Sequence, residues 1–175
     1  MQPTKDTFYI TLRNRLSALN PQRTITLNGV SRPAIVVAEN EAVIPVKPLP
    51  DAFYIEWGAV QAVQPTGDRA MLSLECTISY HTFGTVESGV DRGRTLAVLD
   101  TELISICLPA TTPKLDYTQT PPAALGTNIV WTTPVLGKIM GSEAPRTEAL
   151  PGGTTGVRLE RTASLKVFFF SEISF

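Results

Sequence analysis

Apolar residues recur at helical spacing near the start of the chain. Between Thr7 and Leu19 they follow one another at steps of three and four residues, so they share one face of a helix. These apolar positions are Phe8, Tyr9, Leu12, Leu16 and Leu19. Asp6 precedes the segment and Asn20-Pro21 follows it. We therefore expect Asp6 to cap the helix, which ends before the proline.

A second, longer helix is predicted from Asp91 to Leu108. Its main apolar stripe consists of Leu96, Leu99, Leu103, Ile106 and Cys107, and Val98 and Ile104 widen this stripe. A stripe of this width is typical of a helix that lies on a sheet. Pro109 ends the predicted helix.

Alternation of apolar and polar residues predicts several β-strands. It is clearest from Leu72 to Tyr80, and the last strand, 157–170, follows the same pattern. Phe168 and Phe170 are irregular because they fall on the polar face of that last strand. Shorter strands are expected at 24–27, 34–38, 53–57 and 128–135.

Turn signals separate these strands. Asn28-Gly29 is the strongest hairpin signal in the chain, and Glu39-Asn40-Glu41 predicts a second turn before a short apolar segment at 42–44. Gly58 predicts a bulge or bend in the strand that begins at Phe53. Segments rich in proline, threonine and glycine, at about 109–127 and 137–156, are predicted as long loops.

Together these elements predict a single α+β domain that spans residues 1–175. We expect a twisted antiparallel sheet with one long helix packed on a face and a short N-terminal helix.

Composition narrows the classes of function. The chain has 175 residues, of which 43% are hydrophobic and 18% charged, so it can bury a core and is not a disordered protein. Its net charge of -1 argues against broad or sequence-specific nucleic-acid binding. No signal peptide and no apolar run of about 18 residues is present, so no membrane partner is expected. Cys76 and Cys107 are expected to be buried and reduced.

Residue types that carry catalysis are scarce. The only histidine, His81, falls on the polar face of its predicted strand, where a surface or interface role is expected. The nucleophile motif Gly-x-Ser-x-Gly is absent, and no carboxylates or histidines show metal-ligand spacing. We therefore expect no catalytic residues, no cofactor and no metal. Trp57 and Trp131 leave open a different class, a β-rich module that binds a small ligand or a glycan on aromatic faces.

The order of the elements resembles that of the tail-terminator and tail-completion proteins of long-tailed bacteriophages. The opening helix at 6–16, the strand at 74–81, the helix at 91–108 and the final strand at 158–167 carry this resemblance. It implies a structural virion protein at the tail–neck junction, assembled in the host cytoplasm. Such proteins form six-fold rings that cap the tail tube, bind the tail tube protein and the head–tail connector, and let DNA pass through the lumen. A head-completion or connector subunit has the same element order and stays open.

Candidate interface residues follow from charge and from irregular aromatic positions. Glu87, Asp91, Arg92 and Arg94 could form an intersubunit salt-bridge rim, because arginine pairs well with carboxylates. A solvated surface is the alternative for each of them. Arg13 and Arg15, on the polar side of the first helix, complete the candidates together with Arg158, Glu160, Phe168 and Phe170. For the two phenylalanines, local cover by a helix or loop is the alternative to a contact surface.

Overall fold

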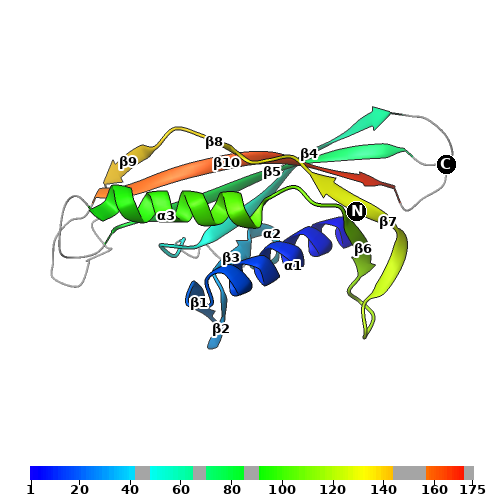
Figure 1. Cartoon of the computed structure of the whole chain (residues 1–175), viewed down its shortest axis with the longest axis horizontal. Helices are drawn as coiled ribbons and strands as arrows, with labels where there is room; N and C mark the ends of the chain where they lie inside the picture. The colour runs from blue at the N-terminus through cyan, green and yellow to red at the C-terminus, as the bar shows by residue number, and fades with distance from the viewer. Residues whose placement is uncertain (42–47, 65–69, 85–90, 144–156, 172–175) are drawn as a thin grey trace.

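The computed structural model describes residues 1–41, 48–64, 70–84, 91–143 and 157–171. In these residues the chain forms a mixed α/β structure that is rich in antiparallel strands and contains few helices. The sheet is long and twisted, and the two longer helices lie together on one of its faces (Figure 1).

The first helix, α1, spans Gln2–Leu19 and begins earlier than the sequence pattern predicts. Pro3 lies in its first turn, where proline loses no helical hydrogen bond. The prediction that Asp6 caps the helix is wrong, because Met1 is at the N-cap position and Asp6 accepts a hydrogen bond from Gln2 Nε2 at 2.8 Å. Phe8, Leu12 and Leu16 are buried as predicted.

A hairpin follows, formed by β1 (Thr24–Leu27) and β2 (Val30–Pro33). Asn28 and Gly29 have φ angles of 50° and 78°, the left-handed values that a two-residue hairpin turn requires, so the turn prediction is confirmed. The strand predicted at 34–38 is present as β3 (Ile35–Val37). It is not the return strand of the hairpin, because so short a turn starts that strand at Val30. Instead β3 pairs in parallel with β4 (Phe53–Gln64).

A short helix, α2 (Ala38–Glu41), replaces the turn predicted at residues 39–41. The apolar segment predicted at 42–44 lies outside the described residues.

Three long antiparallel strands form the centre of the sheet. They are β4 (Phe53–Gln64), β5 (Met71–Thr82) and β10 (Val157–Phe170). The register between β4 and β5 shifts between Trp57 and Val60, which confirms the bulge predicted at Gly58. A Cβ at Gly58 would lie 3.1 Å from the Cβ of Glu75, so the close approach of the two strands favours glycine there.

The long helix α3 (Asp91–Ile106) packs on the sheet through a narrower stripe than predicted. Leu96, Leu99, Leu103 and Ile106 are buried on its inner side. Val98 and Ile104, which the pattern added to the stripe, are 49% and 38% exposed.

The segment predicted as a loop at 109–127 contains two strands. β6 (Thr112–Asp116) and β7 (Ala123–Trp131) form an antiparallel pair, and a cis Thr120–Pro121 peptide lies between them. β6 is the last strand of the sheet, a position that tolerates Pro113 because its outer side needs no ladder hydrogen bond.

The strand predicted at 128–135 therefore begins earlier and ends at Trp131, followed by β8 (Val135–Leu136). The predicted loop at 137–156 begins with β9 (Met140–Glu143), and residues 144–156 lie outside the described residues. The main sheet has the order β3-β4-β5-β10-β7-β6, with β8 and β9 also paired to β10.

Phe8 joins α1 to the sheet. Its ring meets the indole rings of Trp57 and Trp131 edge-on, with centroids 5.6 and 5.2 Å apart. The far ends of β4, β5 and β10 extend beyond both helices and leave part of the sheet uncovered (Figure 1).

Candidate functional site

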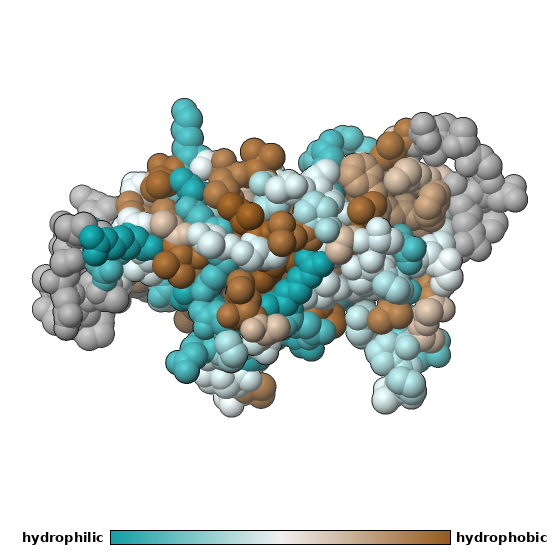
Figure 2. All heavy atoms as spheres, viewed as in Figure 1, coloured by the Kyte–Doolittle hydropathy of each residue, from teal (hydrophilic) through white to brown (hydrophobic). Residues whose placement is uncertain are grey.

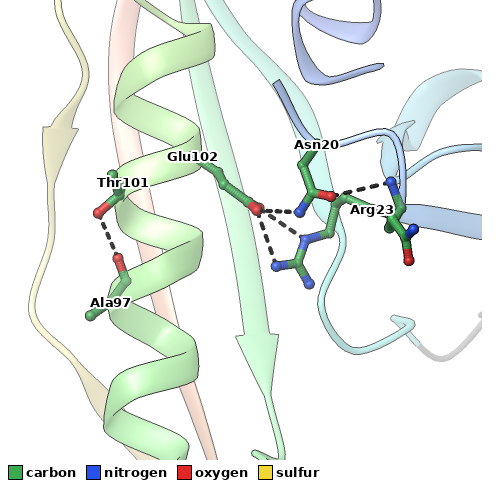
Figure 3. Close-up of polar contacts among 6 residues, drawn as sticks. Asn20, Arg23, Ala97, Thr101 and Glu102 are labelled. Carbon is green, nitrogen blue, oxygen red and sulfur yellow. Dashed lines mark hydrogen bonds and ion pairs between the residues drawn. The ribbon is translucent and has the colours of Figure 1, made fainter. Parts of the chain in front are cut away.

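One polar cluster joins the segment after α1 to the middle of α3. Glu102 is only 7% exposed, and its carboxylate accepts hydrogen bonds from Asn20 Nδ2 at 2.6 Å and from Arg23 Nε at 2.9 Å (Figure 3). Asn20 Oδ1 accepts in turn from the backbone N–H of Gln22 at 3.2 Å. Because both oxygens of Glu102 are bonded within the chain, this acid holds the fold and is not free for a partner.

A second cluster lies between the middle of α3 and the strands β5 and β10. Asp100 accepts hydrogen bonds from the hydroxyl of Tyr80, at 2.5 Å, and from Arg161 Nη1, at 2.6 Å. Burial raises the pKa of Tyr80 above its ordinary range, and the hydrogen bond to Asp100 adds to that shift. The cluster therefore fixes α3 to β5 and β10 by a neutral phenol and an ion pair.

A shallow hollow of about 220 Å³ lies on the opposite face of the sheet, beside β9. Arg158 and Glu160 line it and form an ion pair at 2.9 Å, with side chains 26% and 27% exposed. His81 also lines it, but it is only 5% exposed, so the expected surface histidine is wrong. His81 lies on a central strand opposite Glu160, and its ring meets the ring of Phe83 edge-on at 5.5 Å, which together account for its burial.

The predicted salt-bridge rim joins two subunits, so a single chain does not test it and it stays a prediction; the described residues show only where its members lie. Glu87 lies outside that part. Asp91 and Arg92 are half-buried in the first turn of α3, whereas Arg94 is exposed. Neither arginine forms an ion pair with another described residue.

Arg15 has a structural role that the sequence pattern does not indicate. Its Nη1 donates hydrogen bonds to the carbonyl oxygens of Ile106 and Leu108, at 2.8 and 2.7 Å, and its guanidinium lies 5.2 Å from the ring centroid of Trp131. The expectation that Arg15 lies on the outer side of α1 is therefore wrong, because its side chain satisfies carbonyls at the C-terminal end of α3. Arg13 is half-buried and lies over the ring of Tyr9 at 5.7 Å.

These two arginines make a matched pair for a stability test. We expect Arg15→Ala to lower the free energy of unfolding by about 1.5–3 kcal/mol, because it removes two charge-assisted hydrogen bonds. Arg13→Ala removes only a ring contact and should cost no more than about 1 kcal/mol. Urea unfolding followed by circular dichroism measures both values. Equal losses at the two positions would contradict the helix-capping role of Arg15.

The aromatic irregularity at the end of β10 is visible in the structure. Phe170 is 41% exposed and Phe168 is half-buried opposite Val130, which is itself 37% exposed. Hydrophobic side chains gather at this projecting end of the sheet (Figure 2). Phe169, on the other face of the strand, is only 2% exposed.

Lys114 is a buried cation that sequence reasoning missed. It is 1% exposed, donates a hydrogen bond from Nζ to the carbonyl oxygen of Phe170 at 2.8 Å, and lies 6.0 Å from the ring centroid of Phe169. The lysine joins β6 to the end of β10. Its place in a segment predicted as a loop gave no signal of burial.

The two tryptophans do not form an open stacking surface. Trp131 is 2% exposed and its indole N–H donates to the carbonyl oxygen of Cys107 at 3.0 Å, while Trp57 is half-buried beside Phe8. Cys76 and Cys107 are free and buried, as predicted. Burial raises the pKa of both thiols, that of Cys107 to about 12, so both stay protonated near neutral pH.

Comparison with known proteins adds no relative. No protein-family model matches the sequence, and no curated protein matches it significantly. Within the described ranges, no helix is both long and apolar enough to span a membrane. No three metal-binding side chains of the acidic, histidine or cysteine type gather in that same part of the chain.

Proposed function

We propose that this chain is a structural protein of a long-tailed bacteriophage virion, a tail terminator at the tail–neck junction. In this proposal copies of the chain form a ring, with six subunits as in the proteins that it resembles. The ring caps the tail tube and joins it to the head–tail connector. DNA passes through the lumen without sequence-specific contact, and the protein works without catalytic residues, cofactor or metal.

The observation that carries this proposal is the order of the elements. A long helix, α3, follows the central strand β5 and precedes the long closing strand β10, and α1 opens the chain. The resemblance to tail terminators and tail-completion proteins depends on this order with two strands after the long helix, expected at 128–135 and 157–170, where the described residues form five, β6 to β10. It applies equally to a head-completion or connector subunit of the neck, which is the second candidate.

The distribution of the charged side chains supports a role in assembly. Two acids of α3, Asp100 and Glu102, form ion pairs within the subunit. Arg92 and Arg94, in contrast, have no ion-pair partner among the described residues. Exposed apolar side chains lie at the other end of the sheet (Figure 2). A ring needs different surfaces on opposite sides of a subunit, and such an arrangement meets this condition.

The native mass of the purified chain tests the proposal. We expect light scattering to give a closed oligomer near six times 19.0 kDa over a wide range of concentration, and electron microscopy to show rings. Adding the protein to growing tail tubes should stop their elongation. A chain that stays monomeric and leaves tube length unchanged would contradict the proposal, and rings that bind a connector but not tubes would favour the head-completion role.

A further inference from the structure

One edge of the main sheet is only partly paired. β4 pairs with β5 along its length, but on its other side it pairs with β3 only at Phe53–Ile55. In the part of the chain that the structure describes, no strand lies against the outer edge of residues 57–64. The backbone N–H and C=O groups on this side therefore lack a strand partner.

The opposite edge of the sheet is closed by α1. Thr7 Oγ1 accepts a hydrogen bond from the backbone N–H of Leu115 at 3.0 Å and lies 3.5 Å from the carbonyl oxygen of the same residue, to which it donates. On the outer side of β6, α1 thus satisfies the polar groups of Leu115. Among the described residues, this edge is covered by α1, whereas no strand covers β4 from residue 57 to 64.

The free stretch of β4 lacks the usual protection of an exposed edge. Residues 58–64 read Gly-Ala-Val-Gln-Ala-Val-Gln and contain no charged side chain and no proline. Val60 and Val63 are 41% and 44% exposed. A neutral edge of this length is a template for the addition of another strand, with backbone hydrogen bonds giving affinity.

A suitable second edge lies at the other end of the same molecule. Among the described strands, β9 pairs only with β10; Met140 in β9 and Ile139 just before it are 49% and 51% exposed. Figure 1 places β9 at the opposite end of the long axis from the free half of β4. Glu56, beside the free stretch, and Lys138, before β9, are both exposed and carry opposite charges.

We infer that the free edge of β4, residues 57–64, binds β9 of a second copy of this chain, so that neighbouring subunits share a continuous sheet. Because the two edges are different and lie at opposite ends, the contact is head-to-tail and can repeat around a closed ring. The inference deepens the proposed function and depends on it for ring closure. The uncharged β4 edge at residues 58–64, the exposed Ile139 and Met140, and the opposite charges of Glu56 and Lys138 favour a second copy over a charged partner.

Lysine at the edge tests this inference. We expect Val60→Lys/Val63→Lys to raise the concentration at which the chain assembles by about tenfold or more, because lysine on an edge strand blocks pairing. The single variant Val63→Glu should act in the same direction and uses only one substitution. Val30→Lys is the control, since Val30 is 61% exposed on the β1–β2 hairpin, away from both edges. Circular dichroism and thermal melting verify that each variant is folded.

Hydrogen exchange identifies the surfaces that pair. Amides in residues 57–64 and in β9 should exchange more slowly in the assembled wild-type chain than in the dissociated lysine variant. Edge variants that assemble like the wild type would overturn the inference and leave the ring itself standing. Slow exchange in 57–64 without any change in β9 would overturn the assignment to β9. A wild-type chain that is monomeric at every concentration would overturn the inference, and the tail-tube experiment would then decide the proposed function separately.

Discussion

Replacing Leu99 with alanine is expected to lower the free energy of unfolding by about 2–5 kcal/mol. Leu99 is fully buried where α3 meets the sheet, and Leu103, one turn further along, is equally buried. Removing either side chain loses its transfer free energy and leaves a cavity, because β5 and β10 are held by long ladders and cannot close in on the space. Chemical denaturation of Leu99→Ala and Leu103→Ala measures the effect.

Val98 provides the matched control because it is the neighbouring residue on the same helix. It is 49% exposed, so Val98→Ala should change the free energy of unfolding by less than about 0.5 kcal/mol. The sequence pattern assigned Val98 to the same apolar stripe as Leu99. The control therefore tests whether burial in the structure, and not membership of the apolar stripe, decides the loss of stability. Losses below about 0.5 kcal/mol at both leucines would mean that α3 is not part of the core.

The elements that the sequence predicted well are those in which one face is buried along the whole length. Leu74, Cys76 and Ile78 alternate with polar residues on β5, and all three are buried. β10 behaves in the same way from Ala163 to Phe169. Burial of one face makes apolar and polar residues alternate along a strand, so these strands could be predicted without knowing which strands they pair with. The α3 stripe was predicted too wide because periodicity does not report how much of the helix surface its neighbours cover.

The elements that were missed depend on pairing between distant segments. β6 and β7 lie in a stretch whose prolines, threonines and glycines are typical of loops, yet β7 pairs with β10 and so becomes part of the sheet. β3 has a continuous apolar sequence, which fits a strand buried on both faces, but the hairpin signal next to it gave no indication of its parallel partner. Composition records local preference, whereas strand pairing is decided by the tertiary context.

Candidate site residues were harder to predict than the fold. Arg15 binds carbonyl oxygens that are 91 and 93 positions away, and spacing along the chain contains no information about that contact. Arg158 and Glu160, two positions apart on one strand, do form an ion pair. Phe168 and Phe170 were found because they break the alternation of β10, which is a local signal. Local irregularities in the sequence pattern could therefore be predicted to matter, whereas polar contacts between residues far apart in the chain could not be predicted.

Removing the carboxylate of Asp100 is expected to cost about 3–5 kcal/mol, the loss typical of breaking one side of a buried ion pair. In Asp100→Ala the guanidinium of Arg161, with a side chain only 15% exposed, keeps its charge without its acceptor, and the hydroxyl of Tyr80 loses its partner. Urea unfolding measures the loss. The variant Tyr80→Phe removes only the hydroxyl group that donates to Asp100, and it should cost about 0.5–1.5 kcal/mol.

Glu160→Ala is the control for this loss. Glu160 lies on β10, the strand that also carries Arg161, but its ion pair with Arg158 is more exposed to solvent than the Asp100–Arg161 pair. The Arg158–Glu160 pair is 26% and 27% exposed, so its removal should cost no more than about 1 kcal/mol. A loss at Asp100 no larger than the loss at Glu160 would contradict the role given to the Asp100–Arg161 pair. The expected difference would instead show that α3 is fixed to the sheet by polar contacts as well as by its leucines.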